Sequence, residues 1–148
     1  MKRTLLILLL LPFALIAQKQ ESIVFKGATK ITVKNNLTAD ENYKLAINKL
    51  LDNGFSIESK DAEYKTIKTQ IRKIGNWTYK GFLNIRAKEN EIIFSGMFDS
   101  GIEINVGGVT TKSTFEPIVY KNSGGNKMVF KDMENTALMF SMPLNYSN

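Results

Sequence analysis

Residues Thr66–Phe98, TIKTQIRKIGNWTYKGFLNIRAKENEIIFSGMF, decide the fold class that we expect for this chain. Apolar and polar residues alternate along three segments of this stretch: Thr66–Ile74, Trp77–Arg86 and Glu91–Phe98. Alternation with a period of two is typical of strands that bury one face and expose the other. Only short turn sequences, at Gly75-Asn76 and at Lys88–Asn90, separate the segments. Short connections of this kind join antiparallel neighbours, so we predict an antiparallel meander.

The same alternation predicts which side chains of the meander share a face. We expect Ile67, Thr69 and Ile71 to point into the core and the intervening residues to point into solvent. Positive charge beside an aromatic ring can hold an anionic glycan, a lipid headgroup or an acidic envelope protein. The candidate ligand-binding residues on the solvent face are Lys68, Arg72, Lys80, Phe82 and Arg86. The alternative is a plain solvated face, whose lysines keep sheet edges from aggregating.

A helix is predicted over Ala39–Asn53. Thr38 precedes it and Glu41 follows three residues later, which is the spacing of a capping box. Gly54 supplies a residue that easily adopts the left-handed conformation after the last turn. Apolar residues recur at helical spacing, at Tyr43, Ala46, Ile47, Leu50 and Leu51.

The remaining segments predict further strands and a second helix. The helix covers Lys127–Ser141, and we expect the residues after Pro143 to be frayed. Together the elements predict an α+β fold of order β-α-β-β-β-β-α, with an antiparallel sheet of about five to six strands and two helices packed on one face. The other predicted strands are Ile23–Phe25, Lys30–Lys34, Phe55–Glu58, Ile102–Val106 and Phe115–Tyr120.

The first residues of the chain have the pattern of an export signal. Lys2 and Arg3 precede an apolar run, Leu5–Ile16, and the small residue Ala17 precedes the polar Gln18. We therefore expect a signal peptide over residues 1–17 and a single domain over residues 18–148, exported to the periplasm or secreted. After cleavage we expect no transmembrane span. An uncleaved N-terminal anchor is the alternative.

The composition excludes several kinds of site. The chain has no histidine and no cysteine. A Ser-His-Asp triad, thiol catalysis, a zinc-thiolate site, a disulfide and a lipid anchor on a cysteine therefore cannot form. Loss of Lys2 and Arg3 lowers the formal charge from +6 to +4, because 18 basic and 14 acidic residues then remain. This charge permits an anionic partner, whereas export argues against nucleic acid. We expect neither a metal nor a cofactor.

Carboxylates are the groups that remain for catalysis. Glu58, Asp61 and Glu63 cluster near one predicted turn, and Asp99 and Glu103 flank a glycine. Two carboxylates about 5 to 9 Å apart can hydrolyse a glycoside, so a small carboxylate-dependent hydrolase is the alternative to a non-catalytic protein. Acids in turns are usually solvated, and we predict no catalytic residue.

A glycine-rich loop, Ser123–Lys127, opens the second predicted helix. Backbone amides at a helix start, beside a lysine, can hold an anion. Ser123 or Asn126 would instead serve as an ordinary N-cap in the simpler interpretation.

Residues 31–69, ITVKNNLTADENYKLAINKLLDNGFSIESKDAEYKTIKT, resemble a domain of unknown function from exported proteins of Bacteroidetes-type bacteria. That domain has a TATA-binding-protein-like, or helix-grip, fold, and the resemblance extends over about residues 31–98. It implies a strand, an acid-capped helix and a further strand, and it brings no catalytic residues. A shared fold does not transfer DNA binding. The residues that carry the resemblance are Asp40, Glu41, Tyr43, Leu50, Asp61, Thr66 and Ile67.

These observations predict a non-catalytic binding or accessory protein of the bacterial cell envelope. It would engage its partner through the open face of the sheet or through an exposed sheet edge.

Overall fold

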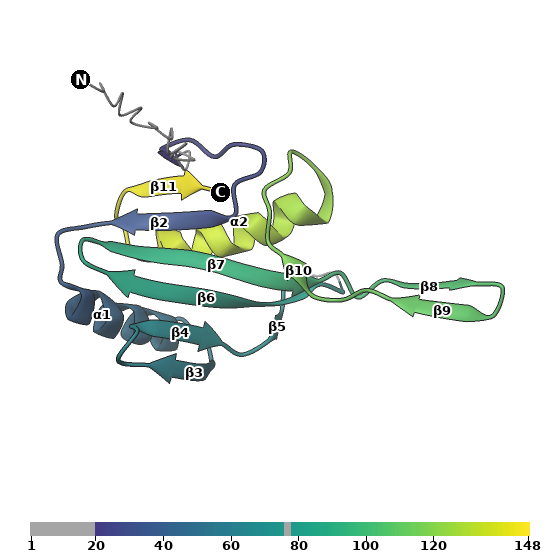
Figure 1. Ribbon diagram of the computed structural model, residues 1–148, viewed down its shortest axis with the longest axis horizontal. Helices are drawn as coiled ribbons and strands as arrows, with labels where there is room; N and C mark the ends of the chain where they lie inside the picture. Colours follow the sequence, from purple (N-terminus) through teal and green to yellow (C-terminus); the bar gives the residue numbers. More distant parts are fainter. Residues whose placement is uncertain (1–19, 76–77) are drawn as a thin grey trace, which may run out of the picture.

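Nine strands form one sheet in the computed structural model, which describes residues 20–75 and 78–148 (Figure 1). The strands are β1 (Gln20–Glu21), β2 (Lys30–Lys34), β3 (Ile57–Asp61), β4 (Thr66–Thr69), β5 (Arg72–Lys73), β6 (Lys80–Lys88), β7 (Glu91–Asp99), β10 (Glu116–Pro117) and β11 (Leu144–Ser147). Their order is β1-β11-β2-β7-β6-β4-β3, with β10 paired to β7 and β5 paired to β6. Every one of these pairs is antiparallel.

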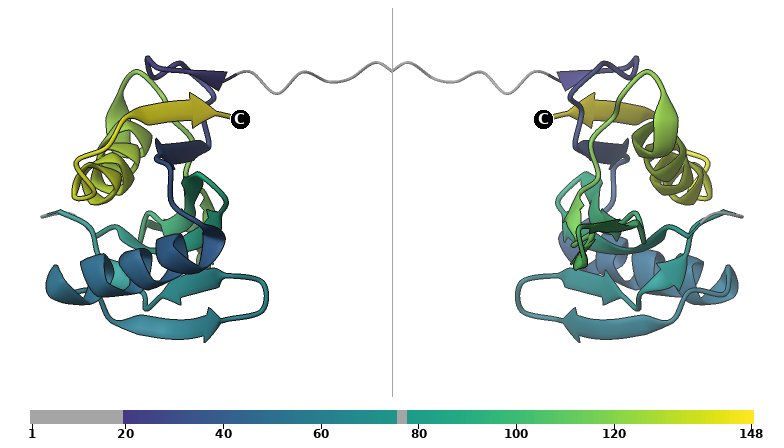
Figure 2. Two further views of the ribbon diagram at one scale, coloured as in Figure 1. Left: turned by 90° about the vertical axis from the view of Figure 1, so that its left-hand side faces the viewer. Right: turned by 90° about the vertical axis from the view of Figure 1, so that its right-hand side faces the viewer.

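Two helices, α1 (Ala39–Asp52) and α2 (Gly124–Leu138), lie on the same side of the sheet (Figure 2). On β7, Ile92, Phe94, Gly96 and Phe98 are buried, whereas the residues that alternate with them are partly exposed. The buried side chains of the sheet join buried side chains of both helices, such as Leu50 and Phe130, in one hydrophobic cluster. The fold is therefore α+β, as predicted, with one face of an antiparallel sheet against the helices.

The hairpin of β6 and β7 is the longest pairing in the sheet. Its register runs over nine residue pairs, from Lys80 opposite Asp99 to Lys88 opposite Glu91. On the core face, a Cβ added to Gly96 would lie 2.8 Å from Cδ1 of Ile118 and 2.7 Å from a backbone oxygen. Glycine at this position therefore gives the side chain of the neighbouring segment the room to pack.

The sheet contains more and shorter strands than the sequence predicted. The predicted strand Thr66–Ile74 is divided into β4 and β5, because the chain leaves the ladder after Thr69. The amide of Gln70 there donates to the carbonyl oxygen of Ser56 at 2.8 Å. Residues Ile23–Phe25 are not a strand. The turn predicted at Gly75-Asn76 lies partly outside the described residues, and Trp77 lies wholly outside them.

A separate hairpin projects from the main sheet (Figure 1). Its strands, β8 (Glu103–Val106) and β9 (Val109–Lys112), form a two-stranded sheet of their own around Gly107-Gly108. The strand predicted over Ile102–Val106 is thus confirmed in its greater part. The strand β9 was missed because its sequence, VTTK, contains a single apolar residue and therefore shows no apolar alternation. We refer to residues 102–113 as the arm.

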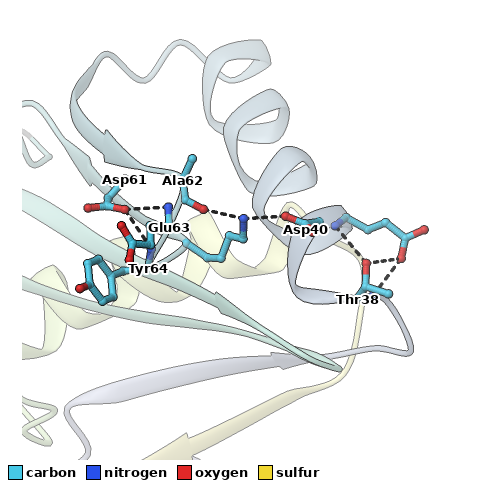
Figure 3. A network of polar contacts seen from close by, with 8 residues as sticks. Thr38, Asp40, Asp61, Ala62, Glu63 and Tyr64 are labelled. Carbon is cyan, nitrogen blue, oxygen red and sulfur yellow. Dashed lines mark hydrogen bonds and ion pairs between the residues drawn. The ribbon is translucent and has the colours of Figure 1, made fainter.

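The N-terminus of α1 is fixed by the predicted capping box (Figure 3). Oγ1 of Thr38 accepts the amide of Glu41 at 3.3 Å, and the amide of Thr38 donates to Oε2 of Glu41 at 2.9 Å. Lys65, in the turn after β3, reaches the same helix end with its Nζ 2.6 Å from Oδ1 of Asp40. The Thr38 cap therefore starts the helix, and the ion pair joins it to the β3–β4 turn.

The residues after Pro143 are not frayed, and that prediction was wrong. They form β11, which lies between β1 and β2 and pairs Tyr146 with Ile31. Tyr146 is buried, and its ring contacts that of Phe130 at a centroid distance of 6.3 Å. Burial and the nearby carboxylate raise the pKa of Tyr146, so its hydroxyl stays protonated and donates to Oε1 of Glu134 at 2.5 Å.

The capping box predicts a measurable loss of stability on substitution of Thr38. Thr38→Ala removes the acceptor of the Glu41 amide, and we expect the free energy of unfolding to fall by about 1 kcal/mol. Urea titration followed by circular dichroism measures this loss. Thr38→Ser keeps the hydroxyl and is the control; an equal loss in both variants would contradict the capping role.

The burial of Tyr146 predicts that β11 stabilises the core. Tyr146→Ala should lower the free energy of unfolding by about 3 kcal/mol or more, because it leaves a cavity beside Phe130. Tyr146→Phe keeps the ring, so we expect a clearly smaller loss. Calorimetric unfolding of the two variants tests this, and near-equal losses would show that the ring is not part of the core.

Candidate functional site

A groove of about 740 Å³ crosses the face of the sheet that the helices leave uncovered. Strands β2, β3, β4, β6, β7 and β11 contribute to it. We refer to this surface as the groove. Its lining residues are Lys30, Thr32, Ser59, Thr66, Ile67, Lys68, Asn84, Ile85, Arg86, Lys88, Glu91, Ile93, Ser95 and Ser147.

The register of the sheet aligns the groove residues in rows across the strands. Thr66 lies opposite Arg86, Arg86 opposite Ile93, and Ile93 opposite Thr32. Directly opposed residues share a face, so these four side chains form one continuous row. The next row on the same face contains Lys68, Asn84 and Ser95. These two rows therefore present hydroxyl, amide and cationic groups around Ile93.

The guanidinium of Arg86 has no hydrogen-bond or ion-pair partner in residues 20–75 and 78–148. Lys68, by contrast, has its Nζ 2.9 Å from Oε1 of Glu58 and 4.6 Å from the ring centroid of Phe82. Charge in the groove is thus only partly compensated, and Arg86 is the cation with its donors available.

The lining of the groove is cationic overall. Its lining residues include four basic side chains and a single carboxylate, which gives a formal charge of +3. That carboxylate, Glu91, lies 2.6 Å from Nζ of Lys34 and 3.7 Å from Nζ of Lys88. Nζ of Lys30 donates to a backbone oxygen of Asn148 at 3.2 Å, which leaves the net positive charge of the lining in place. A net positive surface attracts anions.

The structure places four of the five predicted site residues on the uncovered face. Lys68 and Arg86 line the groove. Phe82 and Lys80 lie further along the same face of β6, and the ring of Phe82 contacts that of Phe115 at a centroid distance of 5.6 Å. The predicted sorting of β6 residues onto two faces is therefore confirmed for the described residues 80–88.

Arg72 lies on the opposite face, and its predicted placement was wrong. It pairs with Gly81 on the core face of β6, forms an ion pair with Asp132 of α2, and lies 4.7 Å from the ring centroid of Phe55. The period-two prediction failed because the strand breaks after Thr69 and resumes in a different phase. Arg72 therefore joins the sheet to a helix.

The same change of phase exchanges two other residues. Ile71, predicted for the core face, is 52% exposed. Lys73 lies opposite Lys80 and takes the place on the uncovered face that was predicted for its neighbour.

Sequence reasoning missed the groove residues that come from the ends of the chain. Lys30 and Thr32 belong to β2, and Ser147 belongs to β11. The pairing of Lys30 with Ser147 depends on a strand that was not predicted. The alternation of β2 was the only local signal for its outward residues.

The acids of the first predicted cluster have local partners. Asp61 accepts the backbone amides of Glu63 and Tyr64, at 2.8 and 2.9 Å, and so closes the turn after β3 (Figure 3). Glu58 pairs with Lys68, as described above. These contacts are those of a turn and of a surface ion pair.

The acids of the second predicted cluster hold the arm. Oδ1 of Asp99 accepts the hydroxyl of Ser113 and, at 2.9 Å, the amide of Gly101. These two hydrogen bonds lower the pKa of Asp99, which favours its ionised form. Glu103 lies 3.0 Å from Nζ of Lys112 across the arm.

The glycine-rich loop before α2 places Ser123 at the N-cap. Its backbone is extended, and its side chain makes no capping hydrogen bond. Gly124 and Lys127 line a second cavity, of about 480 Å³, together with other residues of α2 and with Ile74 and Gly75, which follow β5. Within the described part of the chain, no group of three or more acidic side chains is arranged to hold a metal ion.

Within residues 20–75 and 78–148, neither helix has the length and hydropathy that crossing a bilayer requires. A scan against protein-family models found no match to the chain, and a search of curated proteins found no significant similarity.

The position of Arg72 predicts a pH-dependent loss of stability in Arg72→Ala. Burial raises the pKa of Asp132, and Arg72 opposes that shift, so removal of Arg72 should raise this pKa further. A raised folded-state pKa contributes stability that is present at low pH and lost as pH rises through the folded value. Thermal unfolding should therefore show a small difference from wild type in acid and the largest difference near neutrality.

The control for this prediction is the double variant Arg72→Ala with Asp132→Asn. It removes the uncompensated carboxylate, so it should recover part of the stability at neutral pH. A double variant no more stable than Arg72→Ala at every pH would contradict the role assigned to the ion pair.

Proposed function

We propose that this chain is an exported, non-catalytic binding module of the bacterial cell envelope, and that its groove holds an anionic glycan. The observation that carries the proposal is the unpartnered guanidinium of Arg86 in a groove with a formal charge of +3. Guanidinium donors match the paired oxygens of a carboxylate or sulfate, and such charge-assisted hydrogen bonds are among the stronger ones in proteins.

The other groove residues favour a hydroxylated ligand over an apolar one. Thr66, Asn84 and Ser95 offer hydroxyl and amide groups on the same face as Arg86. These groups can donate and accept, which suits the alternating hydroxyls of a sugar chain. Phe82, beyond one end of the groove, is partly exposed and could stack against a sugar ring.

The order of elements supports a place among exported domains with a TATA-binding-protein-like fold. In residues 31–98 a strand is followed by an acid-capped helix and then by strands, as the resemblance implies. The envelope location in this proposal depends on the predicted signal peptide, whose residues 1–17 lie outside the described part of the chain.

The contacts of the candidate acids favour a binding module over the hydrolase alternative. A general acid needs a pKa raised toward the working pH, whereas the pKa of Asp99 is lowered. Glu58 and Glu103 are engaged in ion pairs.

The proposal predicts that Arg86→Glu weakens binding of a carboxylated polysaccharide. With polygalacturonate oligomers as the probe, calorimetric titration should show a loss of about ten-fold or more, because a hydrogen bond to a charged group contributes about 1.5 to 3 kcal/mol. Added salt should weaken wild-type binding as well. Lys80→Glu, outside the groove, should have a smaller effect.

The matched control is Lys44→Glu, the same charge reversal at an exposed residue of α1 on the other side of the sheet. It should bind the probe as wild type does, and thermal unfolding should show that both variants fold. Equal weakening in the two variants would show that binding depends on the overall charge of the protein and not on Arg86. Binding of acidic peptides or anionic vesicles but not of the oligomers would contradict a glycan ligand.

A further inference from the structure

The arm exposes a continuous apolar face. Its large apolar side chains are between 54% and 72% exposed, and the pairing of β8 with β9 places them on one side of the hairpin. Glu103 and Lys112 pair with each other on the other side. The residues of the apolar face are Ile102, Ile104, Val106 and Val109.

The base of the arm is held in one orientation by hydrogen bonds. Asp99 accepts from the hydroxyl of Ser113 and the amide of Gly101, and Oγ1 of Thr78 donates to the carbonyl oxygen of Ser100 at 2.6 Å. A Cβ on Gly101 would lie only 2.9 Å from a backbone oxygen of Thr78. The arm is therefore attached to the main sheet by specific contacts and projects from it in a defined direction (Figure 1).

One edge of the arm, β8, has backbone groups that point away from β9. The amide of Ser113 donates to the carbonyl oxygen of Ile102 at 2.9 Å, which makes these two residues a hydrogen-bonded pair. Such pairs alternate with pairs whose N–H and C=O groups point outward. Glu103 and Asn105 are of the outward kind. A two-stranded hairpin is only marginally stable in water, and an additional strand would stabilise it.

We propose that the strand added to β8 is β8 of a second copy of this chain. An antiparallel pairing centred on Ile104 places Ile104 opposite its own equivalent. It places Ile102 opposite Val106 of the second copy, and Glu103 opposite Asn105 of the second copy. All apolar residues then share one face, and no like charges lie opposite each other. The outward groups of Glu103 and Asn105 are the ones that this register uses.

The charges of the arm favour a second copy over a charged partner. Glu103 and Lys112 cancel, so two arms approach without net repulsion although the whole chain has a formal charge of +6. The outer edge, β9, ends in Lys112, and a lysine on an edge strand opposes further pairing. The contact has two-fold symmetry and therefore closes as a dimer.

A single introduced cysteine tests the register, because the chain contains no cysteine. Ile104 would lie opposite its equivalent in a pair that is not hydrogen-bonded, with a Cα separation of about 4.5 Å, within the reach of a disulfide. Ile104→Cys should therefore form a covalent dimer on mild oxidation of the purified protein. Thr111→Cys, at the residue paired with Ile104 inside the arm, is the matched control and should cross-link far less.

Charge substitution tests the association without a covalent bond. Sedimentation or light scattering over a range of protein concentrations should give wild type twice the mass of a monomer. Ile104→Lys should give the monomer mass, because two lysines would then lie opposite each other, whereas Thr111→Lys should remain a dimer. Thermal unfolding checks that both variants fold.

Three results would overturn the proposal. The first is a wild-type protein that stays monomeric at every concentration, with equal cross-linking of the two cysteine variants. The second is loss of the dimer in Thr111→Lys but not in Ile104→Lys, which would assign the contact to β9. The third is a monomer whose arm binds lipid vesicles. Arg86→Glu should dimerise like wild type, so a failure of glycan binding does not affect this test.

Discussion

The register between β6 and β7 positions most of the main sheet. β2 and β10 pair with β7, and β4 and β5 pair with β6, so four strands take their places directly from this hairpin. Its core face contains Leu83, Ile85, Ile92 and Phe94, and both helices pack on that side. Because side chains alternate along a strand, a shift of one residue would exchange the core face for the groove. Burial of the apolar set therefore fixes the register and with it the groove.

Fold and candidate site are two faces of the same strands. The residues of β6 that point away from the core include Asn84 and Arg86, which line the groove. Their neighbours across the sheet, Thr66 and Ser95, come from β4 and β7. The site needs no special backbone geometry, since its row of groups follows from ordinary antiparallel pairing. Binding through such a rigid face requires little ordering of the protein when a ligand arrives.

The arm depends on the sheet in a different way. It continues from the end of β7, and Asp99, the last residue of that strand, accepts the hydrogen bonds that hold its base. The arm itself contributes no side chain to the groove. Groove and arm are thus separate surfaces on one framework, so ligand binding and self-association can be examined by independent substitutions.

Local sequence by itself determined the elements whose signals are complete within a few residues. The Thr38–Glu41 capping box and the apolar spacing behind it predicted α1, and strict alternation predicted β6, β7 and the faces of Lys68, Lys80, Phe82 and Arg86. Tertiary structure decided the features that depend on distant partners. β11 is a strand because β1 and β2 pair with it on either side, and Arg72 faces α2 because the ladder breaks after Thr69. The sequence of a four-residue segment cannot encode such pairings, since the hydrogen bonds and buried area that stabilise them involve segments far away in the chain.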